Sequence, residues 1–400
     1  MTRAAYIGGC LSVLLLGAPP LGAQSRQPQT SEVKEPRSTS LAMKAVKVFS
    51  QPLHPVVRGV ASGGGVGAGI GYNFPALGRW ETSAEAVATV YGFWSTGVTT
   101  TRETPRTRLT AYGRVRDMGA LSFFGPGTNS AVDNRTLFGL RDPVAGVVGS
   151  VRLSPWVIAG ARIEEMWPQV SGASSTRFPS TETRFGEAEA PGIADQPRFG
   201  RYHAFVDLIS DAGPAGTLYQ GGKTRIGYGV FDDQQFDRYD VRRIDVETQH
   251  RFTLFGPHRV LTLHGWVSTT DTSTGHEVPF FLQNTLGGKG LIQSVDESLL
   301  GTDGTDATLR GFRTFRFRDR HLLLLQAEYR WPLWGPIDAT VFVDAGKVTP
   351  RRSDLSFSDL KRSYGFSLGA MRGANTAVRM DVGFGGGEGT HVFFTIGRVM

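Results

Sequence analysis

Apolar and polar side chains alternate along most of the chain beyond residue 53. In the segment 338–346, Val341 and Val343 share one face, and Phe342 and Asp344 share the other. The same alternation recurs in many segments up to the end of the chain. A hydrophobic period of two predicts β-strands rather than helices.

The number and the length of these segments narrow the fold class. We expect fifteen to seventeen strands between Val56 and Met400, many of them about ten residues long or longer, whereas strands of soluble sheets usually have about five or six. Strand segments of about ten residues separated by turns are typical of transmembrane barrels. Charged faces such as Arg379 with Asp381 suit a water-filled lumen better than the apolar interface of a sandwich. The pattern predicts an all-β fold, a transmembrane antiparallel β-barrel of about 16 strands, with a soluble sandwich or propeller as the alternative.

Composition and charge agree with this interpretation. The chain has 52 glycines, 25 phenylalanines and 7 tryptophans. Aromatic residues near predicted strand ends are expected to form the girdles at the two membrane interfaces: Trp80, Trp94, Trp167, Tyr329, Trp331 and Trp334. The formal charge of +7 is modest for this length, so nucleic acid is not an expected partner.

The first 23 residues have the layout of a secretory signal peptide. Arg3 is followed by an apolar run from about Ile7 to Leu16, and small residues end at Ala23. We expect cleavage before Gln24, a flexible periplasmic lead-in over 24–53, and the barrel over 54–400. The only cysteine, Cys10, lies in the signal peptide, so the mature chain has no disulfide, zinc–thiolate site or thiol nucleophile.

One segment carries an unusual concentration of arginine. The stretch LRGFRTFRFRDR, residues 309–320, contains Arg310, Arg313, Arg316, Arg318 and Arg320 with Phe312, Phe315 and Phe317 between them. Basic patches with interleaved aromatic residues occur in nucleic-acid grooves. A solvated charged face and a loop inside a polar cavity are two other interpretations.

The surrounding motifs favour the loop. LRGF resembles the hydrophobic–Arg–Gly–aromatic motif of the BamA/TamA/FhaC superfamily of bacterial outer-membrane barrels, the bacterial surface antigen family. VPFFLQNTLGG (278–288) precedes it, and AEYRWPL (327–333) and FVDAG (342–346) follow it in the order of that family. The resemblance extends over roughly Val278 to Met400 and is only architectural before about residue 270.

This resemblance implies that loop six folds into the lumen. Arg310, Gly311 and Phe312 match the tip of that loop, and Asp344 and Glu328 match the carboxylates of the inner wall. A guanidinium forms a planar fork for a carboxylate and keeps its charge. A hairpin turn near 333–335 places the two carboxylates about four residues, or roughly 13 Å, out of register, so we expect Asp344 first and Glu328 second. The other arginines of 313–320 are expected to line the lumen or snorkel rather than bind specific partners.

The end of the chain resembles the closing strand that the barrel-assembly machinery reads. The matching residues are Phe394, Ile396, Gly397 and Met400, where Met400 replaces the usual terminal aromatic. Residues 24–53 are too few for a POTRA domain, so we expect a member without POTRA domains. The resemblance implies a bacterial outer-membrane barrel that inserts or translocates proteins or lipid. Its partners are then outer-membrane lipid, the assembly machinery during its own insertion, and client membrane proteins.

Other functions remain as alternatives. A passive pore or a structural barrel fits the same pattern, and a barrel lipid hydrolase is the least favoured. No histidine lies in a GxSxG or similar signature, and HExxH is absent. We therefore expect no enzymatic activity, no cofactor and no metal. The long irregular segment 168–199 should face the outside of the cell, as long loops of such barrels do, but the expected strand count does not fix on which side of the membrane it lies.

Overall fold

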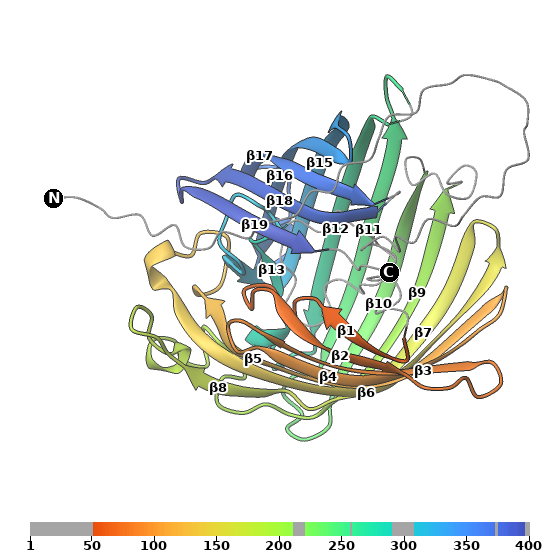
Figure 1. Ribbon diagram of the computed structural model, residues 1–400. Helices are drawn as coiled ribbons and strands as arrows, with labels where there is room; N and C mark the ends of the chain where they lie inside the picture. The colour runs from red at the N-terminus through yellow and green to blue at the C-terminus, as the bar shows by residue number, and fades with distance from the viewer. Residues whose placement is uncertain (1–50, 211–220, 257, 290–307, 373–374, 397–400) are drawn as a thin grey trace, which may run out of the picture.

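The computed structural model describes residues 51–210, 221–256, 258–289, 308–372 and 375–396. Seventeen strands form one antiparallel sheet, and β13 and β14 form a separate two-stranded sheet (Figure 1). The signal peptide and nearly all of the predicted lead-in lie outside the described residues. No helix in the described ranges has both the length and the apolar character needed to cross a membrane.

The strands and short 3-10 helices follow in chain order. The strands are β1 (Leu53–Val57), β2 (Gly67–Asn73), β3 (Trp80–Thr89), β4 (Trp94–Glu103), β5 (Thr107–Phe123), β6 (Thr136–Ser154), β7 (Val157–Met166), β8 (Gln169–Ala173), β9 (Phe199–Ser210), β10 (Gly221–Asp233), β11 (Val241–Thr253), β12 (Val260–Thr272), β13 (Asn284–Leu286), β14 (Phe317–Asp319), β15 (His321–Trp334), β16 (Ile337–Thr349), β17 (Lys361–Arg372), β18 (Asn375–Gly385) and β19 (Thr390–Ile396). The 3-10 helices are η1 (Val132–Asn134), η2 (Thr181–Thr183), η3 (Phe280–Leu282) and η4 (Arg352–Asp354).

The large sheet is a meander. Successive strands pair with one another, except that β8 branches from β6 and leaves β7 to pair with β9. β12 pairs directly with β15, and most of the described residues between them, including β13 and β14, are buried. Without the branch strand β8, sixteen strands follow one another, in agreement with the predicted number. The first of them begins at Leu53 rather than near Val56.

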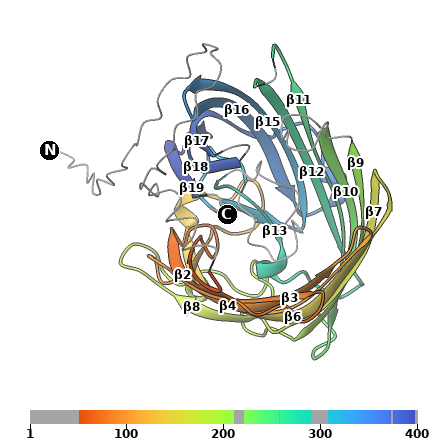
Figure 2. The same cartoon turned by 45° about the vertical axis from the view of Figure 1, so that its right-hand side comes forward.

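The meander curls until its two ends face each other. β19 lies on the side of β1 and β2 in Figure 1, and on the side of β2 in Figure 2. In the described part of the chain, the backbone registers join β1 to β2 and β19 to β18, and none joins β19 to β1 or β2. The sheet is therefore barrel-like, with a junction between its first and last strands.

Connections differ strongly between the two ends of the sheet. At one end, here called the short-turn end, the connections include 74–79, 104–106, 155–156 and 335–336. The other end, the long-loop end, carries 124–135, 167–198, 350–360 and the described parts of the β12–β15 connection, 273–289 and 308–320. The segment 168–199, whose side the sequence left open, thus lies at the same end as the arginine-rich segment.

The two faces of the strands have opposite chemistry. On β11, the side chains of Arg243, Asp245 and Glu247 are buried, whereas Ile244 and Val246 are exposed on the outer face. This is the predicted alternation, with polar residues inside and apolar residues outside. It is the reverse of the arrangement in a soluble sheet and the one expected of a wall between lipid and a polar lumen.

The interior of the sheet is filled by chain rather than left open. The β13–β14 sheet lies within the curve (Figure 2). Phe280, which precedes β13, packs on Phe123 and Phe138 with ring centroids 5.3 and 4.8 Å apart. From the β5–β6 loop, Thr128 Oγ1 accepts a hydrogen bond from the Val348 amide on the far wall at 2.9 Å. Opposite walls are thus connected through the interior.

Candidate functional site

Arg310 is buried against the inner wall, with 1% of its surface exposed. Its Nε donates to Asp344 Oδ2 at 2.8 Å, its Nη2 donates to Asp344 Oδ1, and its backbone amide donates to Oδ2 at 3.1 Å. Burial alone would lower the pKa of this guanidinium, but the charges of Asp344 and Glu328 outweigh burial and raise the pKa above its ordinary value. The arginine is therefore held charged by a two-pronged contact.

The same guanidinium also reaches Glu328. Nη1 of Arg310 donates to Glu328 Oε1. The expected offset of four residues between the two carboxylates is wrong, because β15 and β16 turn at Gly335 and Pro336 and pair Gln326 with Asp344. The offset is two residues, or about 7 Å at strand rise, so both carboxylates lie on one face within the span of one guanidinium.

A second arginine completes the group. Arg379 Nη2 donates to Glu328 Oε1 at 2.7 Å, and its Nε donates to Asp381 Oδ1 at 2.8 Å. Two guanidinium groups thus face three carboxylates, and this Arg310 cluster (Arg310, Glu328, Asp344, Arg379, Asp381) carries one net negative charge. Alternation placed Arg379 and Asp381 on one polar face, but the sequence contained no signal that this face meets Glu328.

Gly311 is required by close backbone approach. A Cβ at this position would lie 2.3 Å from Ser363 Cβ and 2.5 Å from the carbonyl oxygen of Phe384. The positive φ of the turn belongs instead to Leu309, at 73°. Glycine is therefore needed at this position for close packing on β17 and β18 and not for a positive φ. Phe312 is buried beside it, with its ring centroid 5.2 Å from that of Phe317.

Two further arginines of the segment have specific partners. Arg316 Nε donates to Glu388 Oε1 at 2.6 Å, and its Nη1 donates to Ser130 Oγ at 2.8 Å. Arg318 Nη1 donates to the carbonyl oxygen of Phe280 at 2.7 Å. The expectation that these arginines only line the lumen is wrong, because their partners come from loops remote in sequence that fold into the same interior.

Arg316→Ala should destabilise the protein more than Arg313→Ala. Arg316 is buried and makes hydrogen bonds to Glu388 and Ser130, so its loss should lower the free energy of unfolding by about 2–3 kcal/mol. Arg313 is half-buried, and its guanidinium has no hydrogen bond to another described residue, so its replacement should cost under about 0.5 kcal/mol. Urea unfolding in detergent measures both, and equal losses would contradict the assigned role of Arg316.

The predicted closing-strand signal is only partly within the described residues. Phe394 lies on β19 and its side chain is exposed on the outer face. Ile396 is the last residue of β19, and Gly397 and Met400 lie outside the described residues. Recognition of this strand by assembly machinery stays a prediction.

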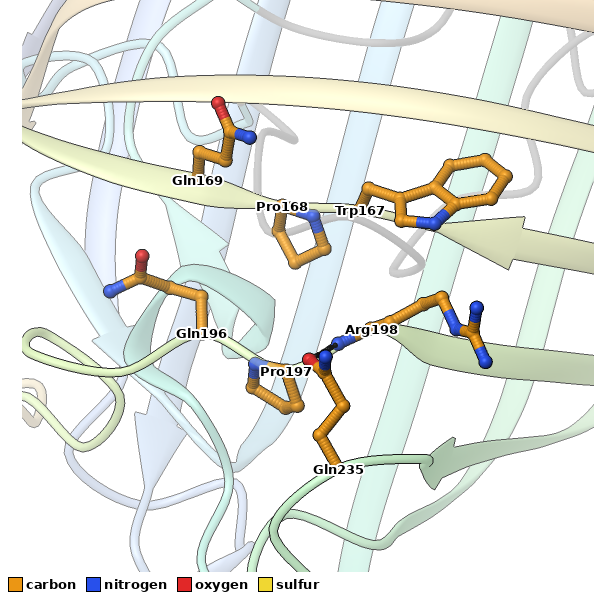
Figure 3. Close-up of a pocket in the computed structure, with 7 residues that line it drawn as sticks. All are labelled: Trp167, Pro168, Gln169, Gln196, Pro197, Arg198 and Gln235. Atoms are coloured by element: carbon orange, nitrogen blue, oxygen red, sulfur yellow. Dashed lines mark hydrogen bonds between the residues drawn. The ribbon is translucent and has the colours of Figure 1, made fainter.

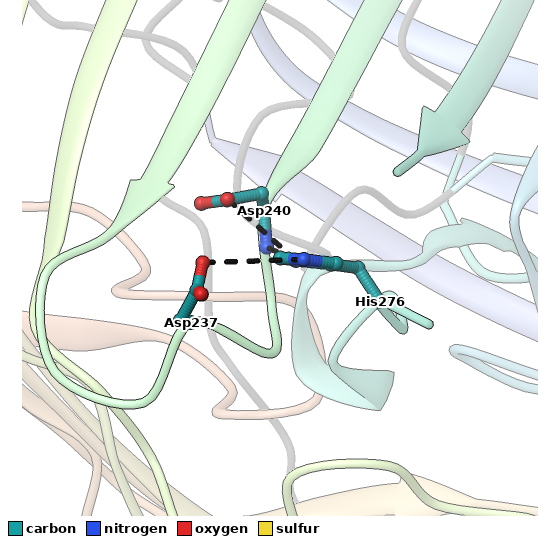
Figure 4. Close-up of side chains that lie close together, drawn as sticks. All are labelled: Asp237, Asp240 and His276. Atoms are coloured by element: carbon teal, nitrogen blue, oxygen red, sulfur yellow. Dashed lines mark hydrogen bonds and ion pairs between the residues drawn. The ribbon is translucent and has the colours of Figure 1, made fainter. Parts of the chain in front are cut away.

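Among the described residues, one group of three side chains has metal-binding chemistry. Asp237, Asp240 and His276 come within 4.8 Å of one another at the long-loop end (Figure 4). Nδ1 of His276 lies 3.3 Å from the Asp240 amide, which donates to it, and Asp237 is 93% exposed on its side chain. Because that ring nitrogen already accepts a hydrogen bond, the group is a set of polar contacts at the rim, and no metal is assigned to it.

Comparison with solved structures supports the barrel fold. The crystal structure of BamA from Haemophilus ducreyi lacking POTRA domains 1–3 is similar over 86% of this chain and 69% of that one, with a TM-score of 0.59 and 11% identity. A bacterial polysaccharide outer membrane secretin (86% and 93% covered, 10% identity) and Pseudomonas aeruginosa OpdL (82% and 89%, 11% identity) give TM-scores of 0.41 and 0.40.

The sequence comparisons add no relative. No protein-family model matches the chain, and the comparison with curated proteins finds no significant match. At 11% identity the likeness to BamA bears on the fold alone. The fold is that of an outer-membrane β-barrel, and membership of the BamA/TamA/FhaC superfamily stays a prediction.

Proposed function

We propose that the chain is an integral barrel of the bacterial outer membrane that inserts or translocates membrane proteins or lipid, in the manner of BamA-type barrels. The observation that carries this proposal is the Arg310 cluster, which holds the segment after residue 308 against the inner faces of β15, β16 and β18. Arg310, Glu328 and Asp344 of this cluster are residues of the motifs that resemble the BamA/TamA/FhaC superfamily. The similar fold of BamA supports the same proposal.

The filled interior argues against a passive pore. A large apolar cluster at the long-loop end joins strand residues to the loops, as in the packing of Phe280 and Phe281 with Phe123, Phe138 and Phe185. Together with the Arg310 cluster it places packed side chains inside the curve of the sheet. We therefore propose low ionic conductance for the resting protein.

The junction between the first and last strands is the edge at which clients or lipid would act. β1 has five residues and β19 has seven, while β15 and β16 have fourteen and thirteen. Edge strands without a mutual register leave backbone N–H and C=O groups that another strand can use. Client membrane proteins are the partners that this edge fits, and outer-membrane lipid is the partner of the apolar outer face.

Reconstitution tests the function directly. Purified full-length protein in liposomes should increase the folding rate of an unfolded client barrel and should give little conductance in a planar bilayer. Steady, large conductance would favour the passive pore, and neither effect would favour a structural barrel. We also propose that the chain is not an enzyme, so phospholipid in the same liposomes should not be hydrolysed.

A further inference from the structure

A pocket of about 270 Å³ opens beyond the ends of β7 and β9, at the long-loop end. Residues 167–169 form one side, residues 196–198 form the other, and Gln235 closes the base (Figure 3). Neither the Arg310 cluster nor the edge between β1 and β19 uses these residues.

Two facing prolines create the pocket. The β7–β9 register pairs Glu165 with Gly200 and ends with Met166 opposite Phe199. Continued by two residues, it places Pro168 opposite Pro197. Proline has no backbone N–H to donate, so the ladder between the two strands stops here. Beyond the prolines β8 leaves to pair with β6, and the strands separate into a fork.

The fork faces the outside of the sheet. Met166 is buried towards the interior, so its neighbour Trp167 points outward, and 38% of its surface is exposed. Ile163 and Tyr202 are exposed opposite each other on the same two strands and belong to the apolar outer band. Trp167 lies four residues beyond Ile163, or about 13 Å at strand rise, and the charged Glu165 lies on the same face between them, so Trp167 is beyond the apolar outer band of these strands.

The side chains offer an aromatic face, a guanidinium and amides together. The register places Trp167 opposite Arg198, and both side chains extend to the same side of the fork (Figure 3). Nε of Arg198 donates to Gln234 Oε1 at 2.6 Å, and the side chain is 49% exposed. Its two terminal nitrogens have no hydrogen bond to any described residue. Gln235 accepts from the Arg198 amide at 2.8 Å, which leaves its NH₂ group available.

One carboxylate forms an ion pair with this guanidinium but no hydrogen bond to it. Glu165 Oε2 is 3.7 Å from Arg198 Nε, beyond hydrogen-bond distance, and Glu165 Oε1 accepts from Gln234 at 3.1 Å. A planar guanidinium with free terminal N–H groups suits a phosphate, an aromatic ring suits the apolar face of a sugar, and amides suit hydroxyl groups. The volume is near the lower limit of about 300 Å³ for ligand pockets, enough for a single headgroup unit.

We propose that this fork binds the phosphorylated sugar headgroup of a glycolipid in the outer leaflet. The inference rests on the proposed function, which supplies the outer membrane and an orientation in which the long-loop end faces the outside of the cell. The acyl chains of the glycolipid would lie along the apolar outer face over Ile163 and Tyr202. Arg198 would hold the phosphate, and Trp167 would cover the sugar ring. An interfacial tryptophan that only anchors the barrel is the alternative outcome.

The test is native mass spectrometry of the full-length protein in detergent, titrated with a diphosphorylated glucosamine-disaccharide glycolipid. Arg198→Gln should weaken retention of one glycolipid about tenfold, since it removes a charge-assisted contact. Trp167→Leu should weaken it several-fold, and Trp167→Phe less. The matched control is Trp156→Leu, because Trp156 is exposed at the short-turn end just before β7 and should leave retention unchanged.

Three comparison ligands separate the possible sources of binding. The dephosphorylated glycolipid and phosphatidylglycerol should both be retained at least about tenfold more weakly, as expected if the phosphate and the sugar are read together. Equal retention of phosphatidylglycerol, or equal retention by Arg198→Gln, would overturn the proposal in favour of an ordinary anionic lipid contact. Equal affinity for soluble glucosamine 1-phosphate would overturn the assignment to a lipid.

Separate measurements keep this test independent of the proposed function. Heat-modifiable migration on a gel reports whether each variant is folded. Fractionation of cells reports whether the protein is in the outer membrane. A folded outer-membrane protein that retains no glycolipid overturns only the headgroup site, whereas a protein absent from the outer membrane overturns the proposed function.

Discussion

Arg310→Ala should lower the free energy of unfolding in detergent by about 3–5 kcal/mol, because it leaves buried carboxylates without their partner. Asp344 would lose its hydrogen bonds to the guanidinium, and Glu328 would keep only Arg379. The net charge of the cluster would fall from minus one to minus two in a buried site. The segment beyond residue 308 should then leave the wall, and protease should cut within residues 300–320 of the folded barrel.

A double mutant tests whether the contact acts as one unit. Asp344→Asn keeps the shape of the side chain and removes one charge, so it should cost less than Arg310→Ala. Combined with Arg310→Ala it should add little, because both changes remove the same interaction. Additive losses of stability, or cleavage of residues 300–320 in the unaltered protein, would show that Arg310 does not hold the segment in place.

Gly311→Ala should have the second largest effect, a loss of about 3 kcal/mol, at the upper end of the usual cost of overpacking. The added methyl group would meet Ser363 Cβ at 2.3 Å and the Phe384 carbonyl oxygen at 2.5 Å. Backbone cannot rotate away as a long side chain can, so the segment would have to lift from β17 and β18. Arg310 is the neighbouring residue and would be drawn off its carboxylates.

The matched control is Gly113→Ala on β5, where a Cβ would meet no atom within 4 Å. Urea unfolding and heat-modifiability should distinguish the two variants, with Gly113→Ala close to the unaltered protein. Faster proteolysis within residues 300–320 should accompany Gly311→Ala. If Gly311→Ala were as stable as the control, the close contact with β17 and β18 would not be needed.

The sequence by itself determined the class of the fold and the faces of its strands. Alternation along 338–346 put Asp344 on a polar face, which the structure turns inward, because successive side chains of a strand must point to opposite sides. The number and the length of the alternating segments predicted about sixteen strands, because alternation is a local property of the sequence and can be read segment by segment. The motif around Arg310 indicated an arginine facing the carboxylates of Asp344 and Glu328, and it put Gly311 and Phe312 at the tip of the same loop.

Only the tertiary structure decided which polar faces meet. The β15–β16 turn at Gly335 and Pro336 set the offset that lets one guanidinium contact both Asp344 and Glu328, and a shift of a residue in that turn changes the offset by two. Arg379 joined the cluster, and Arg316 found its partners, through the curling of the sheet and the folding of loops into its interior. Such contacts join residues far apart in the chain, and periodicity carries no information about them. The fork at Pro168 and Pro197 has the same origin, because each proline is unremarkable alone and ends the ladder only when the register sets it opposite the other.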